Sequence, residues 1–154
     1  MDAVFRTRGQ RQRPSRAVTD EEEPACRPVG IERRDVGVEC ALVGLLFERG
    51  GWRRLSGVGG SMKDIDLLIE QPLTGERASV QIKSAADQRT FEANIAAFDA
   101  SGAASRFFFV CHSPRGSLSL PAGSGDRVHL WTLDKLAATA VDHGLTDWLI
   151  EKAR

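Results

Sequence analysis

Two short segments of the sequence carry polar side chains that could together bind a metal ion. In residues 64–69, Asp66 lies among apolar side chains, and in residues 78–83 Gln81 and Lys83 alternate with apolar side chains. Successive side chains of a β-strand point to opposite faces, so each segment would have a polar and an apolar face. If both apolar faces pack on one helix, Asp66 must lie opposite Gln81 or Lys83.

The chemistry that these side chains could perform is hydrolysis of a phosphodiester bond. That reaction needs a hard cation, and Mg²⁺ accepts carboxylate, carbonyl and water oxygens as ligands. Asp66, the side-chain oxygen of Gln81 and the carbonyl of Ile82 could supply them. Lys83 could orient or deprotonate the attacking water, or stabilise the charge that develops on the phosphate. The sequence leaves these roles of the lysine open.

Glu39 is a fourth candidate, on a different segment. It precedes Leu42 by three residues and Leu46 by seven, so on a helix it would flank the apolar stripe. A carboxylate at this position could reach the metal through a water molecule. Glu32 and Glu48 lie nearby, so the sequence singles out Glu39 less sharply than the hairpin residues.

The elements that must position these residues follow from periodicity and from turn residues. Leu42, Leu45 and Leu46 recur at helical spacing before Gly50, and the turn-prone residues 72–75 separate the two polar segments as in a β-hairpin. Thr132 is a candidate N-cap, and Gly102 and Gly144 are candidate stops. The expected elements are a helix over 35–49, strands over 64–69 and 78–83, a helix over 88–101, strands over 107–111 and 128–131, a helix from 133 to Gly144 and a last short helix around Trp148. This order predicts an α/β fold with a mixed sheet between helices.

The bulk composition bounds the organisation of the chain. Residues 1–30 combine arginines, an acidic run and prolines without apolar periodicity, which predicts a disordered arm before one domain over residues 31–154. No apolar run approaches the roughly 18 residues of a membrane span, and no signal peptide is evident, which favours a cytoplasmic protein without a membrane partner. The formal net charge is zero, so affinity for nucleic acid would need local clusters. Cys26, Cys40 and Cys111 lack metal-ligand spacing and are expected to be reduced thiols.

These residues resemble a known family. Gly37-Val38-Glu39, Asp64-Ile65-Asp66-Leu67 and Val80-Gln81-Ile82-Lys83-Ser84 are similar to the motifs of the PD-(D/E)XK nuclease superfamily, nearest to Mrr-type restriction enzymes and archaeal Holliday-junction resolvases. The resemblance covers roughly residues 35–135. It implies a restriction-endonuclease-like fold of order α-β-β-α-β-β-α and a metal site of Asp66, Gln81 and Lys83, with Glu39 as the glutamate of the first helix. Ile65 stands where the motif has proline, and Gln81 where it has an acidic residue.

The resemblance implies an Mg²⁺-dependent endonuclease that hydrolyses DNA in defence, in repair or as a toxin, with Mn²⁺ as a substitute metal. An RNase with the same metal site is an alternative, and a second is a non-catalytic nucleic-acid-binding module on the same fold. A third is a protein that recruits a partner through its arm. A homodimer is left open, because two copies could be needed to cut both strands of a duplex. Without a metal, Asp66 and Lys83 would be an ordinary cross-strand pair.

Further side chains have both a functional and a structural interpretation. Asp64 shares a face with Asp66 and could bind a second metal, although a surface position at the strand start explains it as well. The same ambiguity applies to polar residues at a helix start and after the apolar strand, which are Gln88, Arg89, His112 and Arg115. The tryptophans could stack on bases, but their apolar surroundings favour core positions for Trp52, Trp131 and Trp148. His129 and His143 show no ligand spacing.

Overall fold

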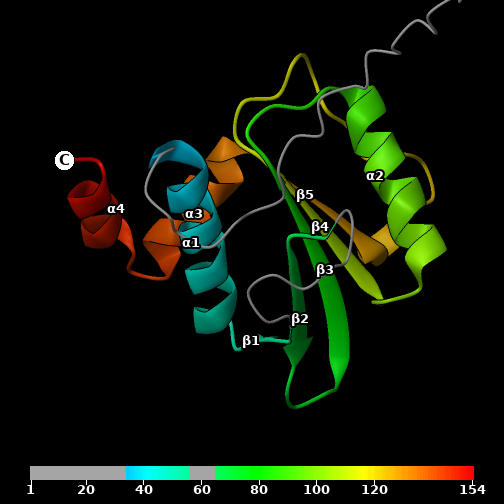
Figure 1. Cartoon of the computed structure of the whole chain (residues 1–154), viewed down its shortest axis with the longest axis horizontal. Coiled ribbons are helices and arrows are strands. Elements are labelled where there is room, and N and C mark those ends of the chain that lie inside the picture. Colours follow the sequence, from blue (N-terminus) through cyan, green and yellow to red (C-terminus); the bar gives the residue numbers. More distant parts are fainter. Residues whose placement is uncertain (1–33, 56–64) are drawn as a thin grey trace, which may run out of the picture.

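The chain folds into a sheet with helices on both of its faces (Figure 1). This computed structural model describes residues 34–55 and 65–154, and the predicted arm over residues 1–30 lies outside them. The elements are α1 (Arg34–Arg49), β1 (Arg53–Arg54), β2 (Leu67–Gln71), β3 (Glu76–Lys83), α2 (Gln88–Ser101), β4 (Arg106–Cys111), a 3₁₀ turn (Gly125–Arg127), β5 (Val128–Trp131), α3 (Leu133–Asp142) and α4 (Thr146–Lys152). None of the helices in these two ranges has the length and apolar character needed to span a bilayer.

The five strands form one mixed sheet in the order β1-β2-β3-β4-β5. The first three strands are antiparallel, whereas β3, β4 and β5 run parallel. In the hairpin, Leu67 lies opposite Val80, and the turn ends at Gly75 with a φ of 71° that favours glycine. The α/β class and the mixed sheet flanked by helices are therefore confirmed.

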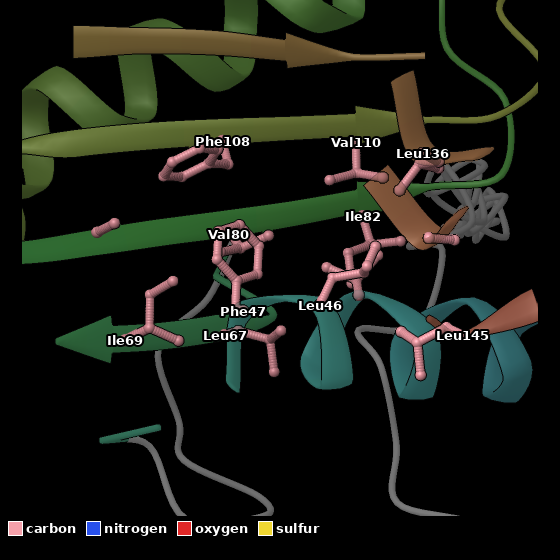
Figure 2. Packing of buried hydrophobic residues seen from close by; sticks show 13 residues of the cluster. Leu46, Phe47, Leu67, Ile69, Val80, Ile82, Phe108, Val110, Leu136 and Leu145 are labelled. Atoms are coloured by element: carbon pink, nitrogen blue, oxygen red, sulfur yellow. The ribbon is translucent and has the colours of Figure 1, made fainter. Parts of the chain in front are cut away.

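One face of the sheet packs on α1, α3 and α4. Leu67 and Ile69 of β2 share this face with Val80 and Ile82 of β3, and Figure 2 shows them beside Leu46 and Phe47 of α1. The Phe47 ring stacks on Trp131 with 5.2 Å between centroids, and meets Phe108 edge-on at 4.8 Å. These contacts fix which face of each hairpin strand is apolar.

The other face packs on α2. Asp87 begins this helix by accepting a 2.8 Å hydrogen bond from the Thr90 N–H, and Gly102 ends it in the left-handed conformation. Phe91 of α2 packs on Phe109 of β4 with 4.8 Å between ring centroids. Because β4 is buried on both faces, it is the central apolar strand that the sequence predicts.

Three differences between the predicted elements and the structure have a clear physical reason, and several other strand ends differ by one or two residues. The predicted strand over 64–69 begins only at Leu67, because the Asp66 side chain, rather than a further backbone carbonyl, accepts the next hydrogen bond from β3. The two-residue strand β1 was missed, since two residues carry no periodicity. Thr132 occupies the N-cap position of α3, but its side chain forms no capping hydrogen bond, and its backbone carbonyl accepts from the Leu136 N–H instead.

The prediction that all three cysteines are reduced is wrong for Cys40. Cys40 is disulfide-bonded, whereas Cys111 is a free and fully buried thiol. Cysteine spacing could not predict the bond, because disulfide connectivity depends on a spatial approach that spacing does not encode.

Candidate metal site at the β2–β3 hairpin

The hairpin register places Asp66 opposite Gln81, one of the two registers that the sequence permits. The Asp66 Oδ2 atom accepts a 2.9 Å hydrogen bond from Gln81 Nε2 and a 2.6 Å bond from the backbone N–H of Ile82. The Asp66 N–H in turn donates to the Val80 carbonyl at 3.1 Å. The carboxylate thus continues the hydrogen bonding of the hairpin beyond the start of β2, and two donors of β3 hold it in position.

Gln81 offers the oxygen that a metal would need. Its side chain is only 4% exposed, and Oε1 has no hydrogen-bond partner within the described part of the chain. A buried amide oxygen without a partner is energetically costly, so its presence calls for a ligand or a donor.

The geometry of this pair fits a divalent cation. In octahedral Mg²⁺ coordination, with Mg–O distances of about 2.1 Å, adjacent ligand oxygens lie about 3.0 Å apart. The Gln81 amide terminus is 2.9 Å from Asp66 Oδ2, and a half-turn of the amide would exchange Nε2 for Oε1 at that spacing. With the amide turned in this way, Asp66 and Gln81 would offer two oxygens at the spacing of adjacent Mg²⁺ ligands.

Ile82 and Lys83 complete the end of β3. Ile82 is buried on the α1 face, but its backbone N–H points to the Asp66 carboxylate, and its carbonyl leaves the strand on the same edge. Lys83 is half-buried and shares its face with Gln81, because they are two residues apart on one strand. Asp64, which the sequence offered as a ligand of a second metal, lies outside the described residues.

Glu39 lies in a second polar group. Its Oε2 atom is 3.4 Å from the hydroxyl of Ser84, and its Oε1 atom lies against Nδ1 of His112, a contact that becomes an ion pair when the imidazole is protonated. Ser84 directly follows β3 and His112 directly follows the parallel strand β4, so both belong to the carboxyl ends of neighbouring strands. Ligand sites in sheets with parallel strands form at such ends.

The structure therefore divides the predicted residues between the two faces of the sheet. Asp66 contacts residues 81 and 82 on the side of α2, whereas Glu39 of α1 contacts residue 84, past the end of the same strand. Among the described residues, no three His, Cys, Asp or Glu side chains converge on one point. A metal beside Asp66 would therefore depend on the Gln81 amide and on backbone oxygens.

His112 is the residue whose place the sequence left undecided. The structure puts it against Glu39, at the end of β4. The signal that could have identified it was its position after a strand predicted to be central, since the end of that strand must lie beside the end of the lysine strand if the two run parallel.

Gln88 and the three tryptophans have structural partners. Gln88 bonds to Glu92 and to the backbone of Ser119, which ties the start of α2 to the following loop. Trp52, Trp131 and Trp148 pack against the core under α1, as predicted. A small pocket of about 20 Å³ between α1, β1 and β2 is lined by Trp52 but by none of the proposed metal-site residues.

Burial and hydrogen bonding shift the pKa values of three groups. Burial raises the pKa of the Cys111 thiol, and the nearby Glu39 charge adds a smaller effect in the same direction. Burial lowers the pKa of His129, with the Arg106 charge as a second cause. Hydrogen bonds with Thr90 lower the pKa of Asp87 at the start of α2. A raised pKa disfavours the thiolate of Cys111.

The chain matches no protein-family model, and no curated protein matches it either.

Proposed function

We propose that this chain is an Mg²⁺-dependent endonuclease of the PD-(D/E)XK type, which hydrolyses DNA. The observation that carries the proposal is the Asp66–Gln81 pair beside Lys83, in which the carboxylate accepts a 2.9 Å hydrogen bond from Gln81 Nε2 and the buried Gln81 Oε1 has no partner among the described residues. The restriction-endonuclease-like arrangement of the elements is part of the same proposal, and the helix–hairpin–helix order of α1, β2–β3 and α2 supports it.

Each residue of the site has a role in this reaction. Asp66 and Gln81 would hold Mg²⁺, with the Ile82 carbonyl as an additional oxygen. The bound cation would withdraw charge from the phosphate and lower the pKa of the attacking water. Lys83, on the face that carries Gln81, would stabilise the negative charge on the phosphate oxygens or orient the water. Glu39 would act from the second group, where it also holds the His112 ring.

A non-catalytic nucleic-acid-binding module is the second candidate, and one observation favours it. Asp66 already accepts two hydrogen bonds from β3, so its carboxylate has a structural use without any metal. Gln81 is also a neutral ligand, which attracts a cation less strongly than a carboxylate. Such a module would bind DNA but would not cleave it.

The decisive experiment incubates the purified protein with plasmid DNA or with tRNA, in Mg²⁺ or in EDTA. We expect Mg²⁺-dependent nicking of the plasmid, and a loss of at least about a hundredfold in Lys83→Ala, in line with removal of a charge-stabilising group. Lys135→Ala is the matched control, because Lys135 is an exposed lysine on α3, on the opposite face of the sheet.

The outcomes separate the candidates. Cleavage of tRNA alone would identify an RNase, and DNA binding without cleavage would favour the non-catalytic module. Cleavage that survives in both Lys83→Ala and Asp66→Asn would show that the site has been assigned to the wrong residues.

A further inference from the structure

The face of the sheet that packs on α2 is apolar on one half and polar on the other. The buried cluster on this face consists of Ala86, Phe91, Phe98, Phe107, Phe109, Cys111 and Val128, from α2, β4, β5 and the segment that leads into α2. On the hairpin half of the same face, β2 carries Glu70, Asp66 directly precedes β2, and β3 carries Arg77 and Gln81. Figure 1 shows α2 beside β4 and β5, on the opposite side of the sheet from α1.

A cluster of two arginines and one glutamate lies at the far end of this polar half. Glu70 Oε1 is 2.8 Å from Arg53 Nη2, and Glu70 Oε2 is 3.3 Å from Arg77 Nε. The Glu70 side chain is 16% exposed, whereas those of Arg53 and Arg77 are 63% and 56% exposed. One half-buried carboxylate thus holds two exposed guanidinium groups side by side on β1 and β3.

We infer that Arg53 and Arg77 bind the phosphate backbone of the DNA strand that enters the candidate metal site. A guanidinium has five N–H donors, and Glu70 accepts one bond from each arginine, so both keep donors for phosphate oxygens. The cluster has a net charge of +1, from two arginines and one glutamate. A polyanion is the partner that this charge and this donor geometry fit.

The placement of the cluster relative to Gln81 supports a backbone contact. Arg77 and Gln81 share a face and are four residues apart on β3, which corresponds to about 13 Å. At an axial rise of 3.4 Å per phosphate, that distance spans about four phosphates of one DNA strand. The arginines would therefore position the DNA strand without contacting the phosphodiester bond that is cut. This inference rests on the proposed function, because it takes DNA as the substrate.

The experiment measures binding of a fluorescent duplex oligonucleotide to the full chain by anisotropy, in EDTA and at several NaCl concentrations. We expect Arg53→Gln and Arg77→Gln each to weaken binding about fivefold to tenfold near 0.1 M salt, and to reduce the slope of log affinity against log salt by about one. Arg77→Lys keeps the charge and should keep the slope. Arg127→Gln is the control, because it removes another exposed, ion-paired arginine, at the other edge of the sheet.

The results test the endonuclease proposal and the inference about the arginines independently of each other. Unchanged affinity and slope in Arg53→Gln and Arg77→Gln would overturn the inference, as would an equal loss in Arg127→Gln or no DNA binding by the wild type. If Arg77→Gln fails to fold, Arg53→Gln on the edge strand and Arg77→Lys still provide the comparison. DNA binding that depends on the cluster, without Mg²⁺-dependent cleavage, would refute the endonuclease and support the inference. Mg²⁺-dependent cleavage together with normal DNA binding in both glutamine variants would support the endonuclease and refute the inference about the arginines.

Discussion

At the scale of single residues, His129 shows how burial couples a side chain to pH. Its ring stacks on Phe108 with 4.6 Å between centroids, and its Nε2 atom is buried with no hydrogen-bond partner in the described ranges. Burial, with the Arg106 charge as a second cause, lowers the pKa of His129 below its ordinary value of 6.5. The folded protein therefore resists a proton that the unfolded chain accepts readily.

This shift predicts that the free energy of unfolding decreases as the pH falls below about 6.5. Above that pH both states hold neutral His129, so the stabilisation is complete. Between 6.5 and the lowered folded pKa, only the unfolded state binds the proton, and stability is lost. Urea unfolding at pH 7.5 and pH 5.5 should show a smaller loss in His129→Phe than in the wild type. His143→Gln is the control, and equal losses in the wild type and His129→Phe would contradict the assignment.

At the scale of elements, the β2–β3 hairpin combines a structural contact with the proposed metal site. Asp66 caps the ladder through the Ile82 N–H, and the same carboxylate faces Gln81. The structural and chemical uses of this aspartate can be separated by substitution, because Asn keeps a carbonyl oxygen where Ala removes the acceptor altogether.

We expect Asp66→Ala to lower the free energy of unfolding by about 1–3 kcal/mol, the cost of leaving a buried donor without an acceptor. Asp66→Asn should lose less than half of that, because its amide oxygen can still accept from the Ile82 N–H. Urea denaturation measures both, with Asp99→Ala as a control that removes an exposed, ion-paired aspartate. A change under about 0.5 kcal/mol in Asp66→Ala would mean that the ladder does not need the carboxylate.

The hairpin also shows what sequence patterns can predict. Alternation in residues 78–83 and the turn at 72–75 determine which face of β3 is polar, and the structure confirms that Asp66 meets Gln81. The bounds of α2 and β5 also agree with the prediction. These features depend on local periodicity, on caps and on turn residues.

The features that sequence patterns missed depend on contacts between distant segments. The Glu39–His112 contact joins α1 to the end of β4, and Cys40 forms a disulfide. Neither leaves a periodic signal. β1 was missed for the same reason, since its pairing with β2 rather than its own sequence makes it a strand.

At the scale of the whole molecule, metal binding should couple to stability. A ligand that binds the folded state alone stabilises it by an amount set by its concentration relative to its Kd. If Asp66 and Gln81 hold Mg²⁺ only in the folded hairpin, a concentration of a hundred times Kd adds about 2.7 kcal/mol to the free energy of unfolding.

Thermal unfolding with Mg²⁺ and with EDTA tests this linkage independently of catalysis. The wild type should melt at a higher temperature in Mg²⁺, and Gln81→Leu should abolish the difference while leaving the fold intact. Gln88→Leu is a control outside the site, where the Mg²⁺ effect should persist. An increase of the same size in Gln81→Leu would show that the ion acts elsewhere.

The two polar contacts of the candidate site differ in how far apart their residues lie along the sequence. Asp66 and Gln81 are 15 positions apart within one hairpin, whereas Ser84 and Glu39 are 45 positions apart on separate elements. Short loops close early and with little entropic cost, and long ones close only as the protein condenses. During synthesis, the Asp66–Gln81 pair would form as soon as the hairpin has left the ribosome. The Glu39–Ser84 contact would form only once α1 had docked on the sheet. A half-assembled protein would therefore have its metal ligands before the rest of its site, and the docking of one helix would decide when the site is complete.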